Sequence, residues 1–459
     1  MYYFLTTRLG YTYDVFTEAC KKNLENKLKI NLKLILIENK MPSFSFIFFI
    51  FKSLVLFKLS KSNLINLKYK QFRVGRFIIP SIFQNYDSYF SIFSYYLGLL
   101  KKIYHAGKII KFLEESKNIK KIKGAYIDHG IYLNGLIIDY FLQKKKFIYS
   151  DNYPRTLFVI NPNKYLKYED ALRIKKKNNS FYKKKLSKNL KKNIVLNPKS
   201  LPWMKTVNFK KIKNKSIYKN YDYIIYAHSF TDAQLTFGYD GFSNVYEWLN
   251  FTINFLRKKN KKIIVKAHPN FFDHKSIIKK KNINPLTYND SLIYNEIIKK
   301  YKNDAKILFI NESLNNIEFL KLLDNKKHIL ITHHGTAIIE TAYFRFKTIS
   351  SAAAPWDKDF RVSNSFSNIK KYKYLLNQNI NNLKLPNLSD LNKLIYEVYF
   401  SDFSMLGKKS YYFFYKKNIN FNKSFSLQNR PKLINKLKKN KLKKSKLILD
   451  LSKNIEIVN

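Results

Sequence analysis

The stretch HILITHHGTAIIETAYFRFKTISS, residues 328–351, has the order of elements of a parallel α/β unit. Its apolar start predicts a short buried strand over 328–332, and the apolar spacing of 336–344 predicts a helix. His333, His334 and Gly335 stand between them, at the carboxyl end of the predicted strand. Ligands bind at such ends in open parallel sheets, and a helix start offers backbone N–H groups to a phosphate. The stretch therefore predicts both a fold and the place of a binding site.

The same alternation continues on the amino side of this stretch. Strands alternating with helices are typical of a doubly wound parallel sheet, so this half of the chain predicts one complete domain. The predicted elements are, in chain order, strand 223–228, helix 242–259, strand 261–268, helix 291–301, strand 305–311 and helix 314–323.

The first 150 residues show the same pattern with longer helical segments. Apolar runs at 1–7, 32–38, 124–130 and 147–150 predict four strands. A chain of 459 residues is too long for one ordinary core, which favours two domains. We therefore predict an α/β protein with two Rossmann-like domains that face a cleft.

Basic residues are dense in two segments and numerous throughout the chain. Lys and Arg number 86 against 31 acids, a net charge of +55. An anionic partner such as a membrane surface or a nucleic acid would explain this excess, but Lys, Asn, Ile, Tyr and Phe are abundant together, and the A/T-rich codons of these residues are the favoured explanation of much of it. Ten basic residues and no acid occur in 173–192, which marks the domain boundary, and nine occur in 430–446. The predicted limits are 1–200 and 201–405 for the domains and 406–459 for a basic tail.

Cysteine usage and apolar segments bound the location of the protein. A single cysteine, Cys20, excludes an internal disulfide and a multi-cysteine metal site. The first 14 residues lack a basic stretch followed by an apolar core, so no signal peptide is expected. The most apolar segment, 43–61, is split by Lys52 into runs too short to span a bilayer. It predicts a buried helix, with an interfacial helix as the alternative, and no transmembrane helix is expected.

Unusual polar residues follow four of the predicted strands. Five of the eight histidines stand at these strand ends, which favours a ligand cleft over scattered surface positions. The residues are Asp128, His129 and Gly130; His228, Asp232 and Gln234; Lys266, His268 and Pro269; and Thr332, His333, His334, Gly335 and Thr336, followed by Glu340.

The residue types at these ends predict group-transfer chemistry on a nucleotide. Lys266, His268 and the helix start at Thr336 are suited to neutralising a phosphate leaving group. Glu340 is placed to hydrogen-bond a ribose, and Asp128 to act as a general base. Two alternatives for the second role stay open, because Asp128 is also suited to capping the next helix and His129 is a competing base.

Other kinds of site find little support in the sequence. The histidine spacings form no compact ligand motif, so no metal is predicted. No G-x-G-x-x-G and no Walker A sequence is present, so no NAD or ATP site and no cofactor is expected. The segment GYDGF, 238–242, is interpreted as a loop and helix start.

Two stretches resemble the capsule polysaccharide biosynthesis family of GT-B glycosyltransferases, which includes the β-Kdo transferases. Residues 223–270, from YIIYAHSFTDAQLTF to KAHPN, resemble the family's strand, Gln and Asp loop, helix and Lys-x-His-Pro sequence. ITHHGTAIIETAYFRFKTI, 331–349, resembles its second nucleotide-site signature. The resemblance extends over about 120–355 and is firmest over 221–351. It implies a GT-B-like fold, with an N-terminal acceptor domain and a C-terminal nucleotide-sugar domain.

A wider similarity to bacterial GT-B transferases that use CMP-sialic acid implies individual roles. DHG, 128–130, resembles their acidic-acidic-Gly motif, with His129 in place of the second acid. His268–Pro269 resembles their His-Pro motif, and Thr336, with Thr332, their Ser/Thr motif. The similarity implies that Asp128 is the base, that His268 binds the donor phosphate and assists its departure, and that Thr336 holds the phosphate.

These observations predict a glycosyltransferase that needs neither metal nor cofactor. Its donor is a nucleotide-sugar, with a CMP-sugar favoured, although His228 stands where the capsule family often has Gln. The predicted acceptor is a surface polysaccharide or a lipid-linked glycan. The expected location is cytoplasmic and peripheral on the anionic inner face of the inner membrane, with no nucleic acid partner. A GT-B nucleotide-sugar 2-epimerase or polyol-phosphate transferase stays open as an alternative, as does a basic nucleic-acid-binding protein.

Overall fold

The chain divides into two compact units, each built around its own six-stranded sheet. The first unit comprises Met1–Ile82, Ser91–Leu172 and Val398–Asn459, and the second comprises Phe83–Phe90 and Arg173–Glu397. The computed structural model describes residues 2–6, 32–36, 42–56, 64–115, 119, 124–127, 131–152, 155–160, 168–176, 195–197, 209–213, 215–232, 234–272, 285–357, 359–400 and 456–458.

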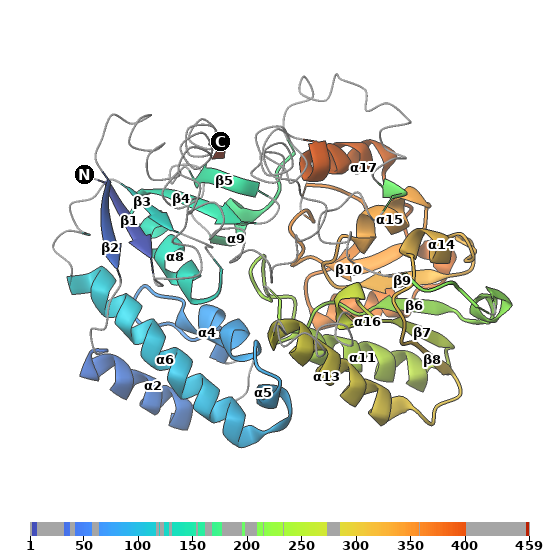
Figure 1. The fold of residues 1–459 in the computed structure, drawn as a ribbon, viewed down its shortest axis with the longest axis horizontal. Helices are drawn as coiled ribbons and strands as arrows, with labels where there is room; N and C mark the ends of the chain where they lie inside the picture. The colour runs from blue at the N-terminus through green and yellow to red at the C-terminus, as the bar shows by residue number, and fades with distance from the viewer. Residues whose placement is uncertain are drawn as a thin grey trace, which may run out of the picture. The chain divides into compact units, whose positions relative to one another are not determined.

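The first sheet has the strand order β12-β5-β4-β3-β1-β2 and is parallel except for the β4–β5 pair (Figure 1). Its β2-β1-β3-β4 part has the order 2-1-3-4 of flavodoxin-type sheets. In such sheets the ligand binds at the switch point between β1 and β3. The strands are β1 (Tyr2–Thr6), β2 (Leu32–Leu36), β3 (Gly124–Ile127), β4 (Phe147–Asn152), β5 (Arg155–Ile160) and β12 (Glu456–Val458). The helices among the described residues of this unit are α2 (Phe44–Leu56), α4 (Val74–Ile82), α6 (Ile92–Glu115), α8 (Gly135–Gln143) and α9 (Tyr168–Leu172).

A buried network of charges ties three helical segments of the first unit together. Arg73, just before α4, places Nη2 2.5 Å from Oδ1 of Asp139 on α8 and Nη1 2.9 Å from Oε1 of Glu169 on α9. Arg76 on α4 is paired with the same Glu169 oxygen. Asp139 and Glu169 are both buried, and each carboxylate is paired with an arginine of the same unit.

The second sheet is entirely parallel and has the order β11-β10-β9-β6-β7-β8. Counted from β6, this is the order 6-5-4-1-2-3 of a Rossmann sheet, so the α/β class predicted from the sequence is confirmed. The strands are β6 (Tyr223–Tyr226), β7 (Ile263–Lys266), β8 (Ile307–Ile310), β9 (Ile329–Thr332), β10 (Thr348–Ser351) and β11 (Asn364–Phe366). The helices are α5 (Asp87–Phe90), α11 (Val245–Lys258), α13 (Pro285–Tyr301), α14 (Asn316–Leu320), α15 (Ala337–Tyr343), α16 (Ile369–Leu376) and α17 (Leu388–Ile395).

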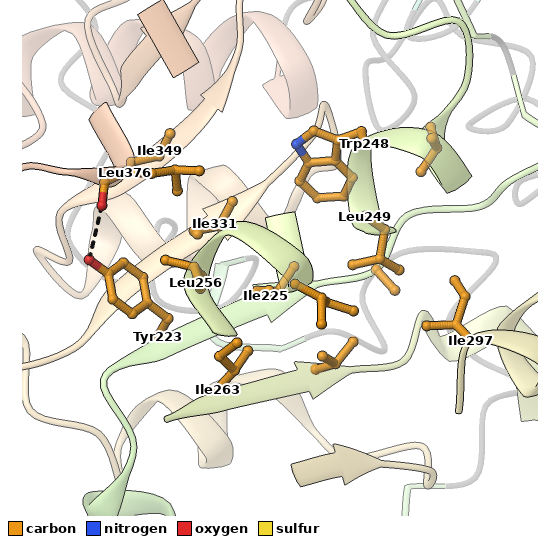
Figure 2. Packing of buried hydrophobic residues seen from close by; sticks show 14 of the residues in the cluster. Tyr223, Ile225, Trp248, Leu249, Leu256, Ile263, Ile297, Ile331, Ile349 and Leu376 are labelled. Carbon is orange, nitrogen blue, oxygen red and sulfur yellow. Dashed lines mark hydrogen bonds between the residues drawn. The ribbon is translucent and has the colours of Figure 1, made fainter. Parts of the chain in front are cut away.

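Helices cover both faces of the second sheet, with α11, α13 and α16 on one side and α14, α15 and α17 on the other (Figure 1). Because side chains alternate along a strand, Ile225, Val265 and Ile331 point into the first layer. There they pack with Trp248 and other buried residues of the cluster drawn in Figure 2, where the Tyr223 hydroxyl also donates to the Leu376 carbonyl at 3.4 Å. Ile224, Ile264 and Leu330 point into the opposite layer.

The unit boundaries differ from the predicted limits of 1–200, 201–405 and 406–459. The chain passes to the second unit at Arg173, because the Arg173 guanidinium donates to the carbonyls of Phe237, Ala352 and Ala354 in that unit. Within the segment predicted as a tail, β12 pairs with β5 in the first sheet.

Within the apolar segment 43–61, the described residues Phe44–Leu56 form α2, whose burial lies between the two alternatives. Phe46 and Ile50 are buried, whereas Phe44, Phe48 and Phe51 are exposed. In the part of the chain that the structure describes, no helix is both long and apolar enough to cross a membrane.

Candidate functional site

Strand register explains why three distant histidines converge. Tyr226 at the end of β6 is the register partner of Lys266 on β7 and of Thr332 on β9. Side chains two residues apart along a strand point to the same face. The residues two positions beyond this row are His228, His268 and His334, so all three rings are expected on one side of the sheet edge.

The rings do meet at that edge. The centroids of His228 and His334 lie 3.9 Å apart, and those of His228 and His268 lie 5.8 Å apart. His228 is buried, and His268 and His334 are half-buried. Because β6 and β9 are the first and fourth strands of the Rossmann order, the His228–His334 contact lies at the point where the strand order reverses. That is the place where nucleotides bind in sheets of this kind.

His333 points to the other face of the sheet and connects the histidine row to a buried aspartate. Its Nε2 lies 2.9 Å from Oδ2 of Asp240, and the Ser351 hydroxyl donates to the same oxygen. Its ring packs edgewise on Trp248, with centroids 5.2 Å apart. Its Nδ1 lies 2.5 Å from Nδ1 of His334, so one of these nitrogens donates and the other accepts. Asp240 thereby fixes the orientation of His333 and, through it, that of His334.

Burial keeps the three histidines of the row neutral at pH 7. Burial, with a smaller contribution from His228 and Lys266, lowers the pKa of His268 to about 3. The pKa of His228 and that of His334 are lowered in the same direction, again chiefly by burial. Neutral imidazoles serve as hydrogen-bond donors or acceptors, so a fixed positive charge at this edge has to come from another side chain.

Lys266 supplies that positive charge. It is 3% exposed, and burial lowers its pKa to about 8. Glu340 on α15 partly opposes this shift, but within the described residues no carboxylate lies at ion-pairing distance from Lys266 Nζ. The ammonium instead lies 5.7 Å from the centroid of the Tyr226 ring. Lys266 is therefore a buried cation whose charge no carboxylate of the described residues neutralises by contact.

Glu340 on α15 is a second group at this edge whose pKa burial shifts toward the neutral form. Burial raises its pKa to about 7, although Asn316 and Lys266 act in the opposite direction. The Asn316 side-chain amide donates to its Oε2. A ligand that brings a phosphate to Lys266 and a hydroxyl to Glu340 would satisfy both groups.

Two buried side chains hold the loop that follows β6. Asp290 on α13 accepts from the Ser229 hydroxyl at 2.5 Å and from the backbone N–H groups of Phe230 and Thr231 at 2.8 and 2.9 Å. Gln234, predicted to contact the donor, donates to the Phe230 carbonyl and accepts from Val245 N at 2.9 Å. Gln234 thus joins this loop to the start of α11.

The remaining predicted residues of the second unit lie around the same edge. Asp232 is exposed and close enough to His228 to raise its pKa against the effect of burial. A Cβ at Gly335 would lie 3.2 Å from His228 Cδ2 and 3.7 Å from Thr332 Oγ1, so the turn passes close over both. Pro269 begins a 3₁₀ turn, Pro269–Phe272, directly after His268. Thr336 precedes α15, and its side chain makes no capping hydrogen bond.

The structure adds Asp240 and Asp290 to the residues found from the sequence. Asp240 had a local signal, because it stands between Gly238 and Gly241, whose φ angles are +146° and +105°. A short acid between two glycines in left-handed backbone is typical of a tightly shaped loop. Asp290 lies inside a helix and has no comparable signal.

Asp128, His129 and Gly130 of the first unit lie outside the described residues. The strand that precedes them, β3, ends at Ile127 beside β1. Among the described residues, no group of three or more His, Cys, Asp or Glu side chains is arranged to hold a metal ion.

By sequence, neither a protein-family model nor a curated protein matches the chain. Two solved structures are similar in three dimensions. One is a UDP-GlcNAc 2-epimerase of Methanocaldococcus jannaschii in complex with UDP-GlcNAc and UDP, 13% identical, with a TM-score of 0.26 over 86% of this chain and 98% of the other. The other is KpsC of Thermosulfurimonas dismutans, a β-Kdo 2,4 transferase, 10% identical, with a TM-score of 0.34 over 61% and 79%. With scores this low, any functional inference has to rest on the site itself.

Proposed function

We propose that the chain is a GT-B-type glycosyltransferase that uses a nucleotide-sugar donor. The observation that carries this proposal is the histidine row His228, His268 and His334 beside Lys266, at the strand-order reversal of a Rossmann sheet. Lys266 is buried and has no contacting carboxylate in the part of the chain that the structure describes, which suits an anionic ligand. This edge is where nucleotides bind in such sheets. The resemblance to the capsule polysaccharide family supports the same assignment.

In the proposed reaction, an acceptor hydroxyl oxygen attacks the anomeric carbon of the donor. The bond between that carbon and the phosphate oxygen breaks, and the nucleotide leaves with the bonding electrons. Lys266 stabilises the developing negative charge, and His268 donates a hydrogen bond to the departing oxygen. Thr336 and the turn at Gly335 hold the phosphate, and Glu340 binds the ribose. The acceptor proton passes to a base, which we assign to Asp128 on the resemblance of DHG, 128–130.

The proposal extends to the classes of donor and acceptor. We favour a CMP-sugar as donor and a surface polysaccharide or lipid-linked glycan as acceptor, with no metal and no cofactor. The test is a thermal-shift screen with CMP, CDP, UDP and GDP. A nucleotide at 100 times its dissociation constant should raise the stability by about 2.7 kcal/mol. No stabilisation by any nucleotide would reject a nucleotide site.

A titration with oligonucleotides at several salt concentrations tests the nucleic-acid alternative. A defined oligonucleotide complex, with affinity that falls steeply as salt rises, would favour that alternative over the enzyme. The predicted enzyme instead binds the mononucleotide saturably and shows no preference for a nucleic acid sequence.

One observation favours the 2-epimerase as the second candidate. The hydrogen-bonded series Asp240, His333 and His334 could move a proton within the second unit, and epimerisation at a sugar carbon requires proton removal. Incubation of UDP-GlcNAc with the protein in heavy water separates the two activities. Deuterium at C2 of the recovered sugar would identify an epimerase, whereas a transferase leaves that carbon unlabelled.

A peripheral position on an anionic membrane belongs to this proposal as well. The nine basic residues of 430–446 are the proposed electrostatic contact, each contributing about 1 kcal/mol near an anionic surface. Truncation would also remove β12, so exchange of these basic residues for Gln is the better test. The expected result is weaker co-sedimentation with anionic vesicles at low salt, with unchanged melting temperature. Unchanged co-sedimentation would reject the tail as the contact.

A further inference from the structure

Two adjacent helices of the first unit expose large apolar side chains. On α2, Phe44 is 83% exposed, Phe48 64% and Phe51 57%. On α6, Phe93 is 74% exposed, Leu97 57% and Leu100 45%, and Ile92 precedes them at 75%. On each helix the spacings of four and three residues place the exposed side chains along one stripe. We refer to these seven residues as the α2–α6 face.

The α2–α6 face exists in addition to a normal buried face. Phe46 and Ile50 of α2 and Leu99 and Ile103 of α6 are buried. The two helices pack closely, because a Cβ at Gly107 of α6 would lie 2.7 Å from the Phe46 ring. Figure 1 shows them side by side in the first unit. Each helix is therefore apolar on two sides, and packing among the described residues uses only one of them.

Charged residues on these helices have one sign up to the end of α6. Between Phe44 and Leu56 and between Ile92 and Leu113, there are five basic residues and no acid. Lys52 and Lys101 are exposed beside Phe51 and Leu100 in the sequence. The first acid is Glu114, which is paired with Lys70 at 2.9 Å. Aromatic and aliphatic side chains next to lysines are typical of helices that lie in a lipid interface.

We propose that the α2–α6 face docks on the surface of an anionic lipid bilayer. The lipid headgroups place negative charge opposite the lysines, and the acyl region accepts the Phe and Leu side chains. A second copy of the chain fits less well, because each copy brings the same lysines and a net charge of +55. With 13 residues α2 is too short to span the hydrocarbon core, so it lies in the plane of the interface.

The proposal rests on the α2–α6 face alone and not on the transfer reaction. Its test is co-sedimentation of the full chain with vesicles of phosphatidylglycerol and phosphatidylcholine, or of phosphatidylcholine only. The triple variant Phe48→Ser/Phe93→Ser/Leu97→Ser should lower the partition coefficient on anionic vesicles by roughly tenfold or more. The matched control Leu385→Ser/Leu388→Ser changes residues that are 51% and 50% exposed in the second unit, and should leave partitioning unchanged.

A charge variant tests the lipid type. Lys52→Glu/Lys101→Glu should weaken binding to anionic vesicles and leave the weak binding to neutral vesicles as it is. Equal binding of the wild type to both vesicles, or wild-type binding by the triple variant, would overturn the proposal. A dimer that the triple variant dissociates, without loss of vesicle binding, would assign the face to a second copy and overturn it too.

Two further measurements keep a negative result interpretable. If the triple variant melts at a lower temperature than wild type, Phe44→Ser replaces it, since that side chain is the most exposed of the seven. Its expected loss is about two- to threefold. Nucleotide stabilisation is recorded on the same samples and should not change in any of these variants. A face that binds vesicles in a chain that binds no nucleotide would leave this inference intact while rejecting the proposed function.

Discussion

One site in each unit handles buried charge in the opposite way to the other. In the first, Arg73 and Arg76 meet the carboxylates of Asp139 and Glu169 directly, at distances down to 2.5 Å for the Arg73–Asp139 pair. In the second, Lys266 is buried without a carboxylate in ion-pairing contact among the described residues. Neutralised charge is what a folded core requires. We propose that the cation at the strand-order reversal is instead kept for an anionic ligand.

The largest expected effect breaks the neutralised network. Asp139→Asn would turn an amide N–H toward the Arg73 guanidinium, so two donors face each other in a buried place. Removing one partner of such a pair costs on the order of 3 kcal/mol. Urea unfolding should show that loss, while nucleotide affinity of the folded protein stays the same. Undiminished stability would mean that the first unit does not depend on the pairing.

A second carboxylate in the same unit should behave in the opposite manner. Asp128→Asn is expected to lower turnover at least about a hundredfold, because a positioned base contributes typically 10²- to 10⁴-fold. Stability and nucleotide affinity should change little. Since Asn caps a helix as well as Asp does, normal turnover in this variant would assign Asp128 to capping. Loss of turnover only in His129→Gln would move the base to the next residue.

The ligand-binding interpretation of Lys266 is tested by removing its charge and keeping its length. Lys266→Met should abolish most of the roughly 2.7 kcal/mol of stabilisation that a saturating nucleotide provides. Without nucleotide, the variant should be as stable as wild type or more stable, because burial of a cation without a contacting countercharge opposes folding. Lys373→Met, on the exposed side of α16, is the control. A large loss of stability without nucleotide would make Lys266 structural.

The pH dependence of the free energy of unfolding should reveal the shifted pKa values of Lys266 and Glu340. The folded pKa of Glu340 is about 7, above the ordinary 4.5, so the folded state binds more protons and stability falls as pH rises between these values. The folded pKa of Lys266 is about 8, below the ordinary 10.5, so stability rises with pH between these values. Subtracting the pH profile of stability of Glu340→Gln from that of wild type should isolate the fall. Subtracting the profile of Lys266→Met should isolate the rise. A flat difference would show that the group is not perturbed.

The smallest effect is expected at the turn that passes over His228. The Cβ of Gly335→Val would press on the His228 ring, from which an ideal Cβ is only 3.2 Å away. Nucleotide affinity should fall several-fold, by about 1 kcal/mol, while the melting temperature stays near wild type. The nucleotide affinity of Gly335→Ala should lie between those of wild type and the Val variant. Unchanged affinity in the Val variant would place the phosphate elsewhere.

The sequence predicted the elements of the second sheet because its strands are continuous apolar runs followed by polar breakers. It also located His228, His268 and His334 at strand ends. It could not predict that β9 lies beside β6, and only that pairing brings His228 and His334 to 3.9 Å. Asp240 was interpreted as part of a loop, because its contact with His333 spans more than ninety residues of chain.

The first sheet shows a second limit of sequence patterns. Three-residue β12 lies in a segment whose composition is that of a basic tail, yet it pairs with β5, almost three hundred residues earlier. Such a short strand carries no periodicity of its own, so pairing between distant segments decides its structure. The boundary near 200 was placed by a run of lysines, whereas Arg173 is held in the second unit by backbone carbonyls that composition does not reveal.

The hydrogen bond between His333 and His334 can run in either direction, and its direction decides what His334 offers to a ligand. Only one proton fits between their Nδ1 atoms, so a shift of that proton reverses what His334 presents at its buried, unpartnered Nε2. Where the Nε2–H of His333 faces Asp240, Nδ1 of His333 accepts from His334, and Nε2 of His334 is left as a lone pair. Where Nδ1 of His333 donates instead, Nε2 of His334 carries the hydrogen and is a donor. A phosphate oxygen accepts only from the donor form, so a phosphate bound at this edge would select one of the two directions of the His333–His334 contact.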